Sequence, residues 1–338
     1  MIRSMLSIVG VCWCATALAQ EAEITPLQTL AEVAAQVEEN VAAFDNFSCE
    51  FDVSIGLLET PAYQRDAKLA EVDGVGHGVW AKQGASELFD FRQEGESPWN
   101  WIGRLPMGPL IYTEGWIRSS DFDLLIHKYG IITSAPDPKF HPRMDPFALF
   151  HTGEGESNAR LLELLRQFIK LQDAQAEVSF AATKTPDGRH FRYQLQTSER
   201  YLTLVFPTGS PGLPTFVSYA TRSSDDAEWL TSRIYVAAAK TVEGVGVFPE
   251  RIVVIYPSED TLIWELKSLA DRQPTAEELT YTADRDLQVM RAGIHRSTIV
   301  EQGQTITPDL LPELYKSLEY RPPEVADQTG AEKNMAKP

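Results

Sequence analysis

Cysteine is scarce in this sequence, with three residues among 338, and two of the three lie in the first 19 positions. Cys12 follows Val11 and Cys14 follows Trp13, so neither has the small preceding residue that lipoprotein processing requires. The remaining thiol, Cys49, has no cysteine partner outside those 19 positions. We therefore expect neither a lipid anchor nor an internal disulfide, and we predict that Cys49 is a small buried hydrophobic residue.

Positive charge is scarce as well. The chain has 30 lysines and arginines against 48 aspartates and glutamates, which gives a net charge of −18. Binding to nucleic acid requires a cationic surface, and adhesion to anionic lipid headgroups requires basic segments. The composition therefore excludes nucleic acid as a partner and disfavours electrostatic attachment to a membrane. After residue 19 no apolar run approaches the length of a membrane span, so we expect no integral membrane protein.

The first 19 residues have the pattern of a secretory signal peptide. Arg3 supplies a positive charge, Met5 to Thr16 form a short apolar run, and Ala17 to Ala19 provide a small-residue cleavage site. We predict cleavage near Ala19 and a protein that acts in the periplasm or is secreted. The expected organisation is a signal peptide at 1–19, one half-barrel domain at 20–318 and a disordered tail at 319–338, which is rich in proline and polar residues.

Motifs of known catalytic sites are missing. No histidine pair has the spacing of a zinc site on a helix, and no Gly-x-Ser-x-Gly nucleophile turn is present. The runs Gly74–Gly76 and Gly244–Gly246 precede no helix, so we interpret both as turns and not as phosphate loops. We expect no enzyme, no metal and no cofactor. A hydrolase with an unrecognised carboxylate or histidine site, to be tested at His141 or His151, stays as a third hypothesis.

Hydrophobic periodicity predicts three helices and many strands. Helical spacing covers Pro26 to Phe44, with Thr25 as its cap, and recurs at Asn158–Leu171 and Pro308–Leu318. Strict alternation from Phe47 to Ile55 predicts a half-buried antiparallel strand. Further strand-like runs, separated by turn residues, are 75–82, 87–92, 109–119, 122–129, 177–183, 190–197, 201–206, 215–222, 229–240, 246–256 and 261–269.

Successive strands joined by short turns favour one antiparallel sheet and exclude an alternation of strand and helix. A sheet of that size curls because twist accumulates from strand to strand. We therefore predict an α+β fold, with a curved antiparallel sheet (half-barrel) of roughly ten strands covered by helices.

Large apolar side chains are the candidates for a ligand cavity. Trp99 and Trp101 lie in an irregular segment rich in proline and glycine, where they would form the lip of a cavity or close the end of the core. The other candidates lie in predicted strands, where each faces either the core or a cavity. The full set is Phe51, Val53, Trp80, Trp99, Trp101, Tyr193 and Trp264.

The order of the predicted elements resembles that of the LolA/LolB-like lipoprotein-carrier superfamily. Two segments carry the resemblance: the opening helix leading into Asn46–Val53, and the pair Ser232–Val236 and Val242–Ile252, where a strand ends in a glycine turn and the next begins with Phe248-Pro249. The resemblance implies a curved half-barrel closed by helices over a hydrophobic cavity. The chain also resembles a class of uncharacterised exported proteins that is common in planctomycete-like bacteria.

Two functions from different classes follow. The first is an exported, non-enzymatic binding protein that holds a lipid, an acyl chain or a lipoprotein in an apolar cavity. The second is a periplasmic structural or sensory module for protein interactions, whose half-barrel is filled by its own side chains. A hydrophobic small molecule or a lipoprotein is the expected partner in the first case, and an unidentified protein in the second.

Overall fold

The computed structural model describes residues 29–94, 113–119, 123–127, 130–134, 146–147, 161–174, 178–208, 212–224, 227–291 and 294–318. The predicted signal peptide at 1–19 and the predicted tail at 319–338 lie outside these residues. Trp99, Trp101, His141 and His151 also lie outside them. Their predicted roles stay predictions.

Three α-helices and one short 3-10 helix are present among the described residues: α1 (Leu30–Ala43), α3 (Leu161–Asp173), α4 (Leu311–Ser317) and η2 (Pro308–Leu310). The strands are β1 (Asn46–Leu58), β2 (Leu69–Gln83), β3 (Ser86–Glu94), β4 (Thr113–Arg118), β5 (Asp123–His127), β6 (Gly130–Ser134), β7 (Ser179–Lys184), β8 (His190–Gln196), β9 (Arg200–Pro207), β10 (Phe216–Thr221), β11 (Leu230–Val242), β12 (Gly246–Ile255), β13 (Thr261–Ala270), β14 (Tyr281–Thr282), β15 (Leu287–Arg291), β16 (Ile294–Val300) and β17 (Thr305–Ile306).

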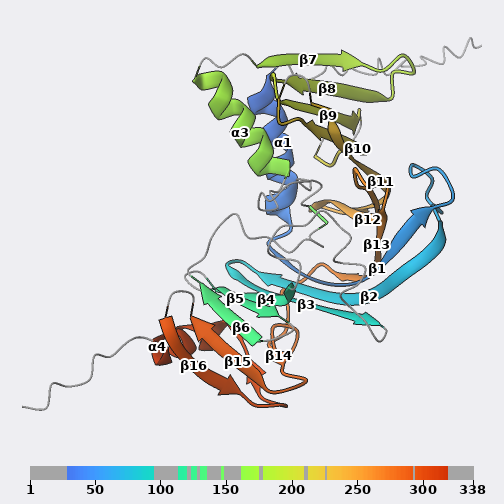
Figure 1. Cartoon of the computed structure of the whole chain (residues 1–338). Helices are drawn as coiled ribbons and strands as arrows, with labels where there is room; N and C mark the ends of the chain where they lie inside the picture. Colours follow the sequence, from blue (N-terminus) through green and yellow to red (C-terminus); the bar gives the residue numbers. More distant parts are fainter. Residues whose placement is uncertain are drawn as a thin grey trace, which may run out of the picture.

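Fifteen strands form one sheet in the order β16-β15-β6-β5-β4-β3-β2-β1-β13-β12-β11-β10-β9-β8-β7, and β14 pairs with β17 in a separate sheet of two strands. Neighbouring strands of the large sheet are antiparallel, except that β15 runs parallel to β6. The sheet curves, and α1 and α3 lie together over its half nearest to β7 (Figure 1). The predicted fold, a curved antiparallel sheet covered by helices, is confirmed.

Some sequence predictions need correction. The sheet has fifteen strands instead of roughly ten, because β6, β15 and β16 add to the twelve segments that alternation had indicated. The run Gly74–Gly76 is not a turn but part of β2, whereas Gly244 does form the turn between β11 and β12 with a φ of 75°. Helix α1 is capped by Thr29 and not by Thr25.

Local sequence explains how α1 begins and where it is fixed. Thr29 Oγ1 accepts a hydrogen bond from the Glu32 amide, and the Glu32 carboxylate accepts one from the Thr29 amide, which satisfies two donors at the helix start. Near the helix end, buried Asn40 bonds both backbone groups of Val247: its Oδ1 accepts from the amide at 2.9 Å and its Nδ2 donates to the carbonyl at 3.1 Å. Helix α1 is thereby attached to the start of β12.

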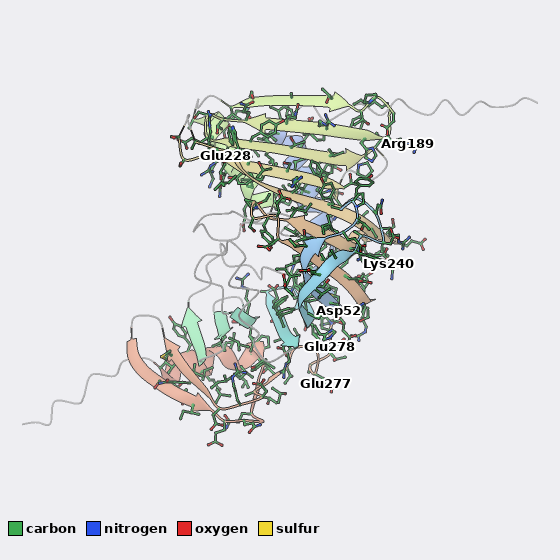
Figure 2. All side chains as sticks on the ribbon, turned by 45° about the vertical axis from the view of Figure 1, so that its right-hand side comes forward. Asp52, Arg189, Glu228, Lys240, Glu277 and Glu278 are labelled. Atoms are coloured by element: carbon green, nitrogen blue, oxygen red, sulfur yellow. The ribbon has the colours of Figure 1, made fainter. Side chains whose placement is uncertain are left out.

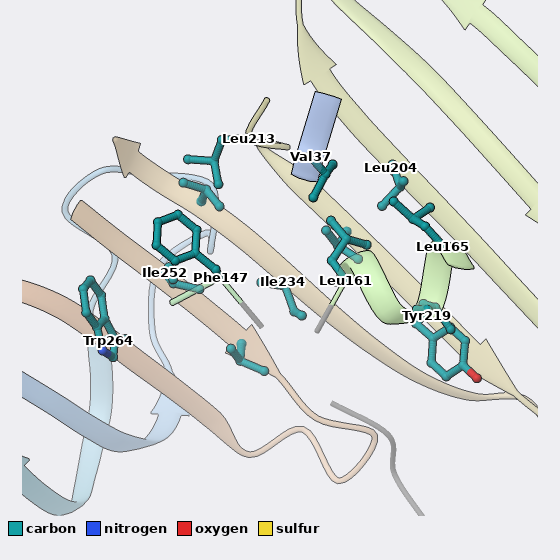
Figure 3. Packing of buried hydrophobic residues seen from close by; sticks show 14 of the residues in the cluster. Val37, Phe147, Leu161, Leu165, Leu204, Leu213, Tyr219, Ile234, Ile252 and Trp264 are labelled. Carbon is teal, nitrogen blue, oxygen red and sulfur yellow. The ribbon is translucent and has the colours of Figure 1, made fainter. Parts of the chain in front are cut away.

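The main apolar cluster lies between the helices and one face of the sheet, which we call the helix face. Figure 3 shows Val37 of α1 and Leu161 and Leu165 of α3 beside Leu204 and Ile234 of the sheet. The strand residues of this cluster alternate with polar ones. In β1 they are Phe47, Cys49, Phe51, Val53 and Ile55, so the predicted burial of Cys49 is confirmed.

A second apolar cluster lies on the opposite face, which we call the outer face. Ala81 of β2 and Leu88 of β3 belong to it, although their sequence neighbours Trp80 and Phe89 belong to the main cluster. Successive strand residues point to opposite faces, so β2 and β3 are buried on both sides. The covering residues come from the segment 271–318: Leu279, Tyr281, Ala283, Leu287, Val289, Val300, Ile306, Leu311 and Leu318.

Candidate functional site

Five of the seven predicted cavity residues are described, and all five lie on the helix face within the main cluster. Each is at most 2% exposed. Four come from three neighbouring strands, Phe51 and Val53 from β1, Trp80 from β2 and Trp264 from β13, and Val53 lies opposite Trp264 in the register. The fold therefore brings these four together.

Tyr193 lies apart from the other four, in β8 near the far edge of the sheet. Its ring stacks on Phe180 at 6.2 Å and meets the edge of Phe206 at 5.8 Å, measured between ring centroids. Tyr193 thus helps to fill the space under the helices at the β7 end, and it does not join the group around Trp264.

Phe51 is the centre of a group of stacked rings that sequence reasoning found only in part. Its ring lies 5.3 Å from Trp264, 5.6 Å from Phe89 and 6.4 Å from Phe91, with interplanar angles of 25°, 28° and 6°. We call Phe51, Phe89, Phe91 and Trp264 the Phe51 stack. The two phenylalanines of β3 follow the same alternation as Phe51, which was a usable signal in the sequence.

Two glycines of β2 make room for this stack. A Cβ atom at Gly78 would lie 2.0 Å from the Phe51 ring, and one at Gly76 would lie 2.3 Å from the Phe91 ring. The rings therefore lie against bare backbone, which only glycine allows. The result is a buried aromatic layer on the helix face of β1, β2 and β3.

The indole N–H groups of two buried tryptophans have different environments. Trp80 Nε1 donates to the carboxylate of buried Glu87 at 2.6 Å, and Arg118 lies 4.0 Å from the same carboxylate. Trp264 Nε1 is buried and has no hydrogen-bond partner within the described part of the chain. An unpaired buried donor costs about 1–3 kcal/mol, so Trp264 presents an unsatisfied polar atom in an apolar environment.

A separate groove of about 560 Å³ lies where the C-terminal end of α3 meets the ends of β7, β8 and β9. One leucine and six polar residues line it: Leu171, Ser179, Gln196, Thr197, Ser198, Glu199 and Arg200. None of the five described cavity candidates is among them. Because none of these candidates lines it, this groove is not the cavity that the sequence predicted.

On the outer face, charged residues form a row across five strands. Arg251, Glu265, Asp52, His77 and Arg92 occupy successive register positions in β12, β13, β1, β2 and β3. Asp52 accepts hydrogen bonds from His77 and, at 2.9 Å, from Lys267.

These contacts favour the ionised form of the Asp52 side chain. Burial would raise the pKa of this carboxyl, but the bonds from Lys267 and His77 outweigh burial and hold the pKa below its usual value. The hydrogen bond to Asp52 raises the pKa of Lys267 in turn. Opposite charges at neighbouring positions of such an exposed row form ion pairs. The alternation of apolar and polar residues in β1 had indicated that Asp52 lies on the polar face of the strand.

Polar contacts also join the segment after β13 to the sheet, through Glu278, which is labelled in Figure 2. Glu278 accepts hydrogen bonds from Ser48 Oγ at 2.6 Å, from Arg272 Nη1 at 2.8 Å and from the Thr275 amide at 2.7 Å. These donors, with Arg272 first, lower the pKa of Glu278 to about 2.

A second group of charges lies beside the outer-face cluster. Arg92 pairs with Asp90 at 3.1 Å and approaches Asp284 at 3.7 Å. Burial raises the pKa of Asp90, although the charge of Arg92 opposes this. Burial, together with Asp90 and Asp284, raises the pKa of Tyr281 to about 12. Two contacts of charged groups, Glu278 with Ser48 and Asp284 with Arg92, therefore join the segment after β13 to the sheet in addition to its apolar contact.

The described residues contain no group of three or more His, Cys, Asp or Glu side chains placed to hold a metal ion. They also contain no helix whose length and apolar character would let it cross a membrane.

No protein-family model and no curated protein matches this chain. Among solved structures, it is similar to a domain proposed to act in outer membrane lipoprotein sorting, from Vibrio parahaemolyticus, with a TM-score of 0.38 and 8% sequence identity. The alignment covers 72% of this chain and 93% of that domain. The fold of this chain is defined by its strand order, its register and the burial of its side chains.

Proposed function

We propose that this chain is an exported, non-enzymatic binding protein that holds an acyl chain, as a free lipid or as the lipid group of a lipoprotein, against the Phe51 stack. The observation that carries the proposal is the combination of a buried aromatic layer, two glycines against it and the unpaired N–H of Trp264, which has no partner among the described residues. Burial of a chain against such a layer contributes about 25 cal/mol per Å² of apolar area.

The N–H of Trp264 adds a chemical preference to this layer. An acyl lipid has an ester or amide carbonyl next to its apolar chain, and that carbonyl accepts a hydrogen bond. A chain lying on the Phe51 stack with its carbonyl at Trp264 would satisfy the donor that the described residues leave unpaired. We therefore expect acyl esters to bind better than plain alkanes of equal length.

Two pyrene-labelled probes of equal chain length, one an alkane and one a methyl ester, test this proposal by fluorescence titration. We expect both to bind, the ester more tightly. Trp264→Phe keeps an aromatic ring and removes the donor, so it should weaken ester binding by about 5- to 10-fold and leave alkane binding unchanged. Trp229→Phe, at a tryptophan that packs against Arg222 on another strand end, is the matched control.

A second candidate is the interaction module with a filled core. The observation that favours it is the close packing of further rings in the same cluster: Phe47 meets Trp80 at 4.8 Å, and Phe44, Phe147 and Phe248 lie within 5.5 Å of one another. If neither pyrene probe binds the folded protein, the carrier proposal is wrong and this second function takes its place.

A further inference from the structure

The fifteen-stranded sheet ends at β7, and this edge lacks most of the features that usually prevent edge pairing, since its only charge is Lys184 at the end of the strand. No described strand or helix lies beyond it (Figure 1). Its sequence, Ser-Phe-Ala-Ala-Thr-Lys, contains no proline and no charge before Lys184, and its register with β8 has no bulge. Exposed edges without proline, bulge or inward charge are templates for pairing with another strand.

The side chains of β7 are complementary to a second copy of the same strand. In an antiparallel pair of identical strands, residues that face each other must lie on the same side of the sheet. A twofold axis at Ala181 meets this condition. It places Ala181 opposite Ala181, Phe180 opposite Ala182, and Ser179 opposite Thr183.

Each of these three pairings is favourable. Phe180 and Ala182 are half-buried on the helix face, so a large ring on one copy covers a small side chain on the other and both lose exposure to water. Ser179 and Thr183 are exposed on the outer face, where two hydroxyl side chains opposite each other form hydrogen bonds. The central alanines leave room for close approach of the backbones.

We propose that β7 is a homodimer interface, in which two copies of this chain pair antiparallel about Ala181 and continue the sheet from one protomer into the other. The twofold arrangement is closed, so it limits assembly through this edge to two copies. It does not depend on the ligand proposed above, because β7 is an edge strand and the Phe51 stack lies in β3, β1 and β13, in the middle of the strand order.

Six residues bury less area than a standard interface, so the dimer should dissociate on dilution. Sedimentation velocity of the full chain from about 1 μM to about 1 mM therefore covers the relevant range. Each copy has a net charge of −18, so the buffer should contain about 0.15 M salt to screen the repulsion between copies. We expect a monomer at the low end and a dimer at the high end.

Charge variants at Ala181 test the register. Ala181→Lys places two lysines opposite each other and should abolish the dimer, and Ala181→Glu should do the same. An equal mixture of the two variants should form a heterodimer. Ile299→Lys, at an exposed position in the other edge strand β16, is the control and should dimerise as the unchanged chain does.

Cysteine pairs give a second test that does not depend on affinity. In a background with Cys12→Ser and Cys14→Ser, Ala181→Cys should form an intermolecular disulfide under mild oxidation, because facing residues in antiparallel strands have Cα atoms about 4.5–5.5 Å apart. Thr183→Cys alone should not crosslink, but it should crosslink to Ser179→Cys. A monomer at about 1 mM, or a dimer that Ala181→Lys leaves intact, would overturn the proposal.

Discussion

The helix face under α1 and α3 and the outer face under the segment 271–318 each enclose an apolar cluster, and β2 and β3 contribute to both. The two regions differ in how their covering elements are attached. On the helix face, α1 and α3 are attached by apolar residues such as Val37, Leu161 and Leu165, and by the hydrogen bonds between Asn40 and Val247. On the outer face, a smaller apolar cluster is joined by contacts of charged groups, from Ser48 to Glu278 and from Arg92 to Asp284.

This difference predicts different responses to the same perturbation. Removing apolar volume should damage the helix face most, because close-packed interiors relax poorly around a cavity. Lowering the pH should affect the outer-face attachment first, because it depends on ionised carboxylates such as Glu278.

The largest effect is expected for Phe51→Ala. The ring contacts three others and is 1% exposed, so its removal should lower the free energy of unfolding by about 3–5 kcal/mol. Chemical denaturation measures this change. Val79→Ala in β2, where the side chain is 38% exposed on the outer face, is the matched control and should change stability by about 0.5 kcal/mol at most. Equal effects of the two substitutions would show that the Phe51 stack is not the centre of the helix-face cluster.

An intermediate effect is expected for Gly78→Ala, because the new methyl group would overlap the Phe51 ring. The overpacking should cost about 1–3 kcal/mol. Combining it with Phe51→Leu should cost less than the sum of the two single changes, because the smaller side chain vacates the space that the methyl group needs. Additive costs in this double-mutant cycle would contradict the close contact between Gly78 and Phe51.

Sequence alternation was enough to predict the helix face, since Phe47 to Ile55 alternate with polar residues and Phe89 and Phe91 continue the pattern. It was not enough for the outer face. In β15, exposed Met290 follows buried Val289, so apolar residues fall on both sides and the period of two is lost. The role of Gly76 and Gly78 could not be predicted for another reason. It depends on aromatic rings that lie against these glycines from other strands, and the local sequence does not indicate such contacts.

A smaller effect is expected for acid on the outer-face attachment. The pKa of Glu278 is about 2 in the folded chain against an ordinary 4.5, so its stabilising contribution is complete above pH 4.5 and is lost as the pH falls toward 2. Asp90 acts in the opposite direction, because burial raises its pKa and the folded state takes up that proton first.

Pepsin cleavage within residues 271–318 measures this attachment at acid pH. Glu278→Gln should be cleaved faster than the unchanged chain at pH 4.5, by less than about tenfold because the group is partly solvated, and the two should converge near pH 2. Glu277→Gln, at the exposed neighbouring position, should have no such effect. A constant ratio of cleavage rates across this range would mean that Glu278 does not hold the segment.

The smallest effect on stability is expected for Trp264→Phe. It removes a buried donor that has no partner within the described part of the chain, so the free energy of unfolding should stay the same or rise slightly. Thermal unfolding of the variant beside the unchanged chain measures it. A loss of about 2 kcal/mol or more would reveal a hydrogen bond to Trp264 Nε1 and would remove the reason to expect a carbonyl there.

The central claim is that the helix face holds an acyl chain, and native mass spectrometry of the protein purified without detergent tests it most directly. The account predicts a species heavier than the chain by the mass of a fatty acid or an acyl lipid, and exchange of that mass after incubation with a defined acyl ester. A protein that shows only its own mass before and after incubation would contradict the account.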